Sequence, residues 1–274
     1  MNSMRLVRPS SALARQALLA TAVLALLAGC GTSPKDATAN MSNDKLYSEA
    51  REEASMGNFE QAGKLYEKLE GRATGTVLSQ QAQLELAYTQ FKSGEKALAQ
   101  ATIERFLKLH PTSPAFDYAL YLQGIINFND NLGILGSVTR QDLSERDQQA
   151  ARDAFQSFKQ LVDRFPQSKY APDAQLRMNY IVNSLASYEV HVARYYYLRG
   201  AYLAAANRAQ QTLIDFQTSP ATEEALYIMA QSYDKLGLNE LRDDTDRVLK
   251  TNFPKSEFLS QGFRGPDKPW WQVW

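Results

Sequence analysis

The sequence predicts an all-α protein made of repeated helix pairs, on three observations. Glycines recur 37 residues apart, at Gly57 and Gly94 and again at Gly200 and Gly237, each between two segments of helical pattern. Apolar residues in these segments follow a three-four spacing, which indicates helices with one buried face. No stretch alternates convincingly as a strand, and a period of this length is typical of stacked helical repeats.

Residues 1–29 are predicted to be a cleaved signal peptide. Three arginines precede the apolar run 17–28, which is too short for a membrane span because such a helix needs about 20 residues. Leu27 to Cys30 then resembles a bacterial lipobox, after which the cysteine becomes the lipidated N-terminus. We expect Cys30 to carry diacylglycerol and an N-acyl chain such as palmitate, which together anchor a protein firmly. The other interpretation is an ordinary signal peptide that ends near a cysteine.

The residues after Cys30 indicate where the anchored protein resides. An aspartate directly after the cysteine usually retains bacterial lipoproteins at the inner membrane, and this chain has Gly31. We therefore expect the protein to be anchored in the outer membrane, with its folded body facing the periplasm. Residues 30–43 are small and polar and are predicted to form a flexible tether. With 30 basic and 30 acidic residues, the chain lacks the excess of positive charge that is typical of nucleic-acid-binding proteins.

The repeat body is expected over residues 44–255 as five helix pairs. A glycine between the two helices of a pair would end the first helix with a positive φ. Prolines follow second helices at Pro111, Pro166 and Pro254, where the helix cannot continue. The run 173–199 has neither glycine nor proline and predicts one helix of about 40 Å. The expected pairs span 44–71, 79–110, 115–166, 173–217 and 221–255.

Two segments depart from the repeat pattern. Residues 129–149 form an insertion into the third pair, expected as a loop that lies on its own groove or contacts a partner. Residues 256–274 form a turn-rich tail that ends in Trp270, Trp271 and Trp274. Exposure of three tryptophans would be unfavourable, so we expect them to dock on this chain or on a partner.

The residues needed for catalysis or metal binding are missing from the sequence pattern. His110 and His191 lie on separate repeats without a local partner, and a lipidated Cys30 cannot act as a nucleophile. His191 is expected to be packed or hydrogen-bonded. The acidic run Asp243, Asp244 and Asp246 lacks the glycine and the later glutamate of a calcium loop. The sequence therefore predicts a protein that is not an enzyme and holds no cofactor or metal besides its covalent lipid.

Four longer sequence segments resemble those of a known family. The most specific is HVARYYYLRGAYLAAANRA, residues 191–209. The others are ERFLKLHPTSPAFDYALYLQG (104–124), DLSERD (142–147) and AFQSFKQLVDRFPQSKYAPDAQLRM (154–178). With the lipobox and the repeats, the chain resembles the BamD family, lipoproteins of the outer-membrane β-barrel assembly machinery. The resemblance implies a tetratricopeptide-repeat (TPR) solenoid that acts as a scaffold.

The resemblance also implies two binding surfaces. The C-terminal repeats would bind a BamA-type barrel subunit, with Arg199 matching the arginine that the family uses against an acidic residue, and with Tyr196 and Tyr202 beside it. An arginine suits bidentate pairing with a carboxylate. Alternatively, Arg199 satisfies the last carbonyls of its own helix. The partners would include other lipoproteins of the assembly complex, and the N-terminal repeats would receive unfolded outer-membrane β-barrel proteins.

The substrate end departs from the family pattern. Family members commonly carry a YPFGPYS-like segment, whereas residues 72–79 are RATGTVLS. The substrate-binding candidates here are Arg72, Gly75, Tyr47 and Phe59, and the aromatic residues, Tyr66 included, suit a core position equally well. A different function remains open at this point, that of a TPR lipoprotein adaptor which organises periplasmic cell-wall enzymes.

Overall fold

The structure is a computed structural model that describes residues 38–128 and 148–263. The predicted signal peptide with Cys30, most of the tether, residues 129–147 of the insertion and the three tryptophans of the tail lie outside the described residues. The chain divides into two compact units, 1–46 and 47–274. In the first, Ser42 Oγ accepts the N–H of Lys45 at 3.3 Å and so caps the helix α2 (Asn43–Ser55).

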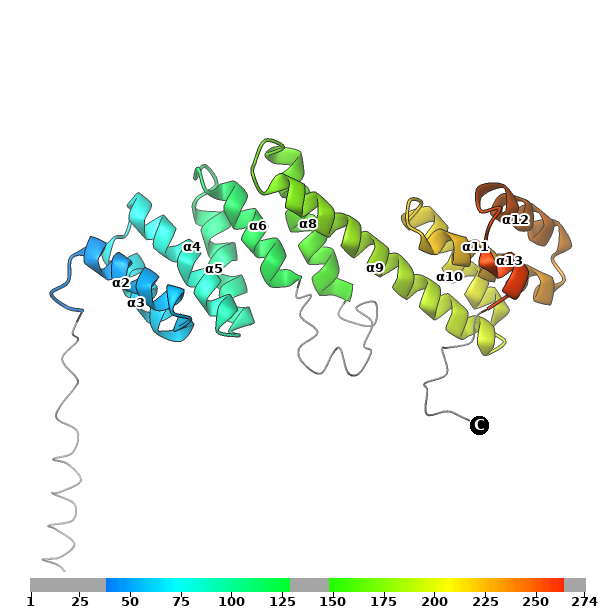
Figure 1. The fold of residues 1–274 in the computed structure, drawn as a ribbon, viewed down its shortest axis with the longest axis horizontal. Coiled ribbons are helices and arrows are strands. Elements are labelled where there is room, and N and C mark those ends of the chain that lie inside the picture. Colours follow the sequence, from blue (N-terminus) through cyan, green and yellow to red (C-terminus); the bar gives the residue numbers. More distant parts are fainter. Residues whose placement is uncertain (1–37, 129–147, 264–274) are drawn as a thin grey trace, which may run out of the picture. The chain divides into compact units, whose positions relative to one another are not determined.

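The prediction of an all-α fold built from helix pairs is confirmed. The described residues form helices joined by short turns and contain no strand (Figure 1). The predicted long helix is α9 (Ala171–Leu198), which runs 28 residues without interruption. The remaining helices are α3 (Phe59–Arg72), α4 (Val77–Lys92), α5 (Lys96–Leu109), α6 (Phe116–Asn127), α8 (Gln148–Arg164), α10 (Tyr202–Asp215), α11 (Ala221–Leu236), α12 (Asn239–Asn252) and the short α13 (Glu257–Gln261).

The glycines of the 37-residue spacing occupy the left-handed backbone region, as predicted. Their φ angles are 84° at Gly57, 89° at Gly94, 78° at Gly200 and 73° at Gly237. At Gly200 the next residue's N–H returns to the carbonyl of Tyr196, which closes the last turn of α9. A residue with a Cβ rarely adopts this conformation, so the spacing of these glycines marks where one helix of a pair reverses into the other.

In the second unit, each helix from α3 to α12 packs on the next described helix along the chain, and α9 also contacts α11 (Figure 1). The small residues predicted on the face of α10 are buried: Ala205 and Ala209 are fully buried against α9 and α11. Alanine at these positions lets the neighbouring helices approach closely. No helix among residues 38–128 and 148–263 has both the length and the apolar character that a membrane crossing requires.

A close contact between α6 and α8 anchors the middle of the unit. Gly124 lies inside α6 and faces the ring of Phe158, a fully buried residue of α8. A Cβ built on Gly124 would lie only 2.4 Å from the nearest ring atom. The ring can reach this position only because residue 124 has no side chain. Sequence patterning did not single out Gly124, because a glycine inside an apolar helix carries no periodic signal.

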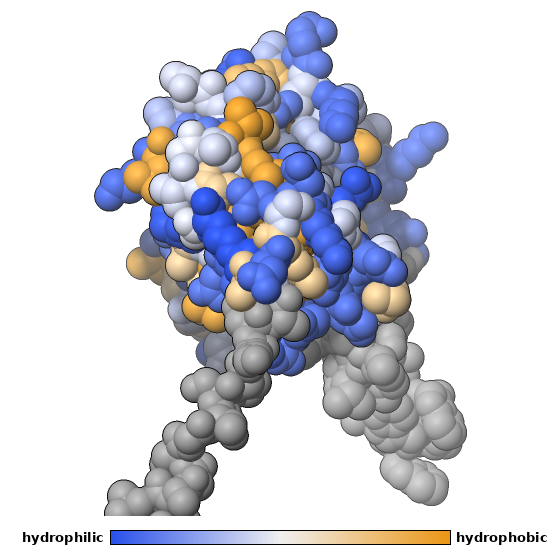
Figure 2. Space-filling model, turned by 90° about the vertical axis from the view of Figure 1, so that its left-hand side faces the viewer, coloured by the Kyte–Doolittle hydropathy of each residue, from blue (hydrophilic) through white to orange (hydrophobic). Residues whose placement is uncertain are grey.

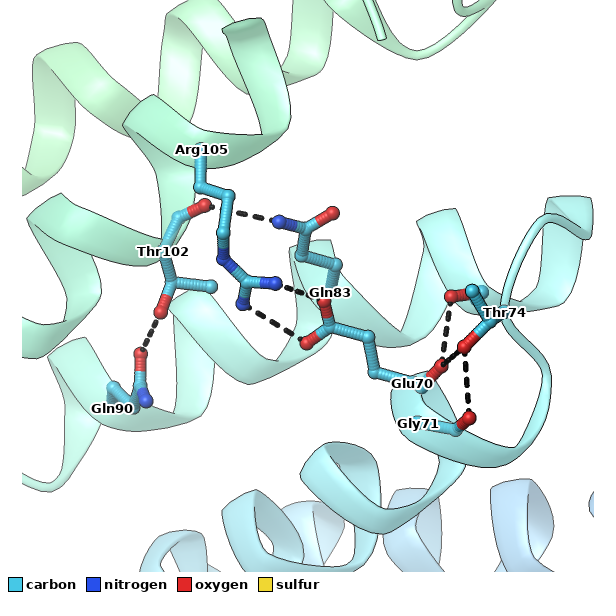
Figure 3. A network of polar contacts seen from close by, with 8 residues as sticks. Glu70, Gly71, Thr74, Gln83, Gln90, Thr102 and Arg105 are labelled. Carbon is cyan, nitrogen blue, oxygen red and sulfur yellow. Dashed lines mark hydrogen bonds and ion pairs between the residues drawn. The ribbon is translucent and has the colours of Figure 1, made fainter. Parts of the chain in front are cut away.

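A polar network joins α3, α4 and α5 around the turn that includes residues 72–76 (Figure 3). Arg105 of α5 forms a bidentate ion pair with Glu70 of α3, and one of its two N–O distances is 3.1 Å. Gln83 of α4 donates to the carbonyl of Thr102, and the hydroxyl of Thr102 donates to Gln90 at 2.8 Å. These contacts hold three consecutive helices in register beside the turn.

The first residues of the predicted tail fold back onto the helices. Phe258 of α13 stacks on Tyr227 of α11, with ring centroids 5.4 Å apart. Phe263 packs between Tyr197 of α9 and Tyr227, at 5.0 and 4.9 Å. Residues 257–263 thus dock on the helices, whereas the docking of the three tryptophans, which lie outside the described residues, stays a prediction.

Gly124→Ala should destabilise the protein even though alanine favours a helix by about 1 kcal/mol over glycine. Overpacking a filled core costs about 1–3 kcal/mol, and the ring of Phe158 is fully buried among other core residues. We expect a net loss of about 1 kcal/mol in the free energy of unfolding, measured by urea denaturation. Gly71→Ala in α3 is the matched control, because its added Cβ would meet nothing within 4 Å and should stabilise. Equal effects of the two substitutions would contradict this account.

Candidate functional site

The turn between α9 and α10 presents Arg199 to solvent. Arg199 ends α9, and its backbone N–H donates to the carbonyls of Tyr195 and Tyr196 at 3.2 Å. Its guanidinium lies over the ring of Tyr195, 5.3 Å from the centroid. Within residues 38–128 and 148–263 the guanidinium makes neither an ion pair nor a hydrogen bond to a carbonyl. It is therefore a charged group available to a carboxylate on another molecule.

The two tyrosines predicted beside Arg199 are only partly exposed. Tyr196 packs against the apolar cluster of α9, α10 and α11, and Tyr202 packs on Tyr197 with centroids 5.5 Å apart. The residues that extend the exposed surface are instead apolar ones that sequence reasoning missed. Leu198 is 69% exposed, and Tyr195 and Leu203 are also exposed. A positive charge beside exposed apolar side chains is a composition typical of protein interfaces.

Ion pairs beneath the turn hold α9, α10 and α11 together. The carboxylate of Glu189 in α9 is buried and lies 2.8 Å from Arg208 of α10. Arg194 of α9 pairs with Glu224 of α11, whose side chain is also largely buried. Removing one partner of such a pair leaves a buried charge uncompensated, which is strongly unfavourable. The pairs therefore hold the helices on both sides of Arg199 in one arrangement.

A second candidate site is a cleft of about 830 Å³ in the N-terminal half of the second unit. Three separate segments build it: the first turns of α4, the connection between α5 and α6 with the start of α6, and the connection between α8 and α9. Its lining combines apolar and polar side chains. The residues that define it are Val77, Gln80, Leu84, Glu85, Leu109, Asp117, Tyr118, Lys169 and Tyr170.

The cleft exposes apolar side chains at its edge and a carboxyl group within its lining. Val77 is 79% exposed and Leu109 is 59% exposed, although both are large and apolar. Glu85 is partly buried, and this burial raises the pKa of its carboxyl group, an effect that Arg51 partly offsets. Burial also raises the pKa of Tyr118 beyond the ordinary range of a tyrosine. In the view of Figure 2, small groups of apolar residues lie among hydrophilic ones.

The predicted substrate residues do not line this cleft. Tyr47 packs edge-on against Tyr66 at 6.0 Å, and its hydroxyl accepts a hydrogen bond from Gln81, which does line the cleft. Phe59 packs against Tyr88 at 6.4 Å and lies beneath the ammonium group of Lys92.

Two further candidates lie at the turn before α4. Arg72 is exposed in the last turn of α3, and Gly75 has a φ of 81°. Among the sequence candidates, Tyr47 is hydrogen-bonded to a residue that lines the cleft, Gln81.

The acidic run of α12 forms ion pairs on its own helix rather than a metal site. Asp244 binds Arg247 at 2.8 Å, Asp243 binds Arg242, and Asp246 lies 3.8 Å from Lys250. The described ranges contain no group of three or more histidine, cysteine or acidic side chains placed to hold a metal ion. His110 packs on Phe106. His191 is exposed and its side chain makes no hydrogen bond within the described residues, contrary to the expectation that it is packed or hydrogen-bonded.

Glu85→Gln should raise the melting temperature at neutral pH, because it removes a partly buried carboxylate. The raised pKa means that the folded protein holds this proton more tightly than the unfolded chain, so the native protein loses stability as pH rises through the raised pKa. The advantage of the variant should therefore be largest at pH 7 and shrink as pH falls into the ordinary range of glutamate. Thermal melts followed by circular dichroism measure it. The control is Glu67→Gln, an exposed glutamate of α3, and an equal advantage there would contradict the assignment.

Comparisons with known proteins cover nearly the whole chain. A family model described as "Outer membrane lipoprotein" (YfiO) matches residues 39–249. The outer membrane protein assembly factor BamD of Neisseria meningitidis serogroup A is 47% identical over 265 residues, which is 95% of this chain and 99% of that protein. The BamD of Vibrio cholerae is 35% identical over 86% of this chain and 98% of its own.

Among solved structures, a TPR protein of Thermus thermophilus covers 80% of this chain and 95% of its own at 16% identity, with a TM-score of 0.37. That likeness is too weak to carry an argument. The family assignment rests on the match of the family model and on the sequence relatives. The chain belongs to the outer membrane lipoprotein family whose members include the BamD assembly factors.

Proposed function

We propose that this protein is a non-enzymatic scaffold for the assembly of outer-membrane β-barrel proteins. The observation that carries the proposal is the 47% identity, over 95% of the chain, to a protein named as an outer membrane protein assembly factor. The protein would be anchored in the outer membrane by the lipid on Cys30 and would face the periplasm. Its mechanism would be binding, with one surface for a membrane-embedded partner and another for the unfolded substrate.

The partner surface is assigned to the α9–α10 turn. Arg199 would pair with a carboxylate of a BamA-type barrel subunit, and the exposed Leu198 and Leu203 would bury apolar area around that pair. Tyr196 and Tyr202 would support the turn from below rather than form the centre of the contact. Other lipoproteins of the same complex would bind elsewhere on the repeats.

The substrate surface is assigned to the cleft formed by α4, the start of α6 and the connection between α8 and α9. Its exposed Val77 and Leu109 would contact the apolar side chains that an unfolded β-barrel protein presents. Of the candidates chosen from sequence, Tyr47 would act through Gln81. Arg72, Gly75 and Phe59 would contribute only to a longer surface beside the cleft.

Cys30→Ala should release the protein from the membrane without unfolding it, because the anchor would be the covalent lipid. Fractionation of cells should move the protein from the membrane to the soluble periplasmic fraction, with an unchanged circular dichroism spectrum. A variant that stays in the membrane fraction to the same extent as the parent protein would rule out the lipid anchor.

Arg199→Glu should weaken binding of the barrel subunit by at least about tenfold, since it replaces an attraction by a repulsion. The free energy of unfolding should change by no more than about 0.5 kcal/mol, because the side chain is exposed. Pull-down from mild-detergent extracts measures the first quantity and urea denaturation the second. Arg247→Glu is the matched control, an exposed arginine whose ion pair lies within its own helix.

A photoreactive residue at position 199 separates this function from the alternative of an adaptor for cell-wall enzymes. The expected product is an adduct with a BamA-type protein. Adducts with peptidoglycan enzymes alone would refute the proposed partner. Equal losses of binding and of stability in Arg199→Glu would show that the residue is structural.

A further inference from the structure

Several polar side chains that line the cleft already have partners. The hydroxyl of Ser113 donates to Gln80 at 2.9 Å. The carboxylate of Asp117 accepts the N–H of Tyr118 and the hydroxyl of Ser168, both at 2.7 Å. Such groups gain little by exchanging these bonds for bonds to a ligand.

Lys169 at the edge of the cleft is also engaged. Its ammonium group lies 5.0 Å from the centroid of the Tyr170 ring. A cation held over an aromatic face in this way is partly compensated. The residue is exposed, so water screens its charge more strongly than that of a partly buried group.

Glu85 differs from Asp117, the other carboxylate that lines the cleft. In the part of the chain that the structure describes, no hydrogen bond or ion pair reaches its carboxylate, although the residue is partly buried. Arg51 acts on it electrostatically but lies beyond ion-pair distance. An ionised carboxylate that has lost water without gaining a partner is costly, so buried charges in proteins are normally paired.

A second unpartnered group lies beside Glu85. The hydroxyl of Tyr66 is fully buried and has no hydrogen-bond partner within the described residues, and Tyr66 interacts electrostatically with Glu85. Native proteins leave few buried polar groups unsatisfied. The hydroxyl does not line the cleft and makes no bond to Glu85, so the carboxylate remains a group that a ligand with hydrogen-bond donors would satisfy.

The walls around Glu85 define the rest of the ligand. Leu84, Leu109 and Tyr118 line the same cleft as Glu85 and give it apolar and aromatic surface. The side chains of lysine and arginine match such a site, because their alkyl stems pack on apolar surface while the charged head reaches further. An isolated aliphatic side chain would fill the space but would leave Glu85 unpaired.

We propose that Glu85 makes this cleft selective for extended segments that carry a lysine or arginine next to apolar side chains. The inference rests on the proposed function, since the segments would belong to unfolded outer-membrane β-barrel proteins. Glu85 acts as the specificity-determining residue, and the exposed Val77 and Leu109 supply apolar contact that does not depend on the charge. The cleft disfavours segments with an acidic residue at the same position.

The test uses three fluorescent peptides of alternating apolar and small polar residues, with lysine, norleucine or glutamate at one central position. Each peptide is made with a free and with an amidated C-terminus, so that a contribution of the terminal carboxylate is measured separately. Binding to the full-length protein in mild detergent is followed by fluorescence anisotropy, against the detergent alone. We expect the lysine peptide to bind at least tenfold more tightly than the norleucine peptide, and the glutamate peptide to bind most weakly.

Variants assign the selectivity to Glu85. In Glu85→Gln the ratio between the lysine and norleucine peptides should fall close to one, whereas Glu67→Gln should retain the parent ratio. Glu85→Lys should reverse the preference towards the glutamate peptide. Leu109→Asn should weaken the binding of all three peptides by a similar factor, because it reduces only the apolar contact. Circular dichroism melts of each variant establish that it is folded.

The outcomes separate the inference from the proposed function. Binding without preference for lysine, or a preference that persists in Glu85→Gln, overturns the inference and leaves a general peptide cleft. Binding that depends on the free C-terminal carboxylate instead of lysine overturns it as well. If the parent protein binds none of the peptides, the assignment of the cleft to substrate fails, and the inference fails with it.

Discussion

Each helix of the second unit depends on its sequence neighbours to bury its apolar face. The contact of Gly124 with Phe158 is the closest example, where the absence of a side chain on α6 lets a buried ring of α8 fill the space. The small alanine side chains of α10 likewise let α9 and α11 pack closely against it. Because burial is completed between neighbours, the turns and outer helix faces remain available for partners. Both candidate sites lie at such turns.

Charged pairs then restrict how neighbouring helices can be arranged. Arg105 joins α5 to Glu70 of α3, and Glu189 joins α9 to Arg208 of α10. A shift of one helix along the other would leave a largely buried carboxylate without its cation, which is unfavourable. Glu85 differs from these glutamates, since no cation within the described residues pairs with it. This contrast, rather than the number of charges, distinguishes a structural carboxylate from one that is available to a ligand.

The helix pairs were predictable from sequence because their signals are local. The glycines of the 37-residue spacing, the prolines after second helices and the unbroken run before Arg199 each mark an element boundary without knowledge of the rest of the chain. The α9–α10 turn was predictable for the same reason, because Arg199 directly precedes a glycine that ends a helix. The short helix α13 was missed because it has too few residues to show a period.

The cleft could not be predicted from sequence. It unites Val77, Leu109 and Lys169, which are far apart along the chain and come together only in the folded protein. Aromatic composition directed attention to Tyr47 and Phe59, yet both rings pack against other aromatic rings. The exposure of Val77 and Leu109 and the unpaired state of Glu85 are properties of the assembled surface.

The position of Phe263 has a practical consequence for work on the C-terminal end. Its ring lies between Tyr197, three residues before Gly200, and Tyr227 of α11, so residues that follow the last repeat form part of the support beneath the α9–α10 turn. A protease cut, an affinity tag or a stop codon placed ahead of this phenylalanine would alter the packing below Arg199. Loss of partner binding after such a change would then report on lost support, even with every contact residue intact.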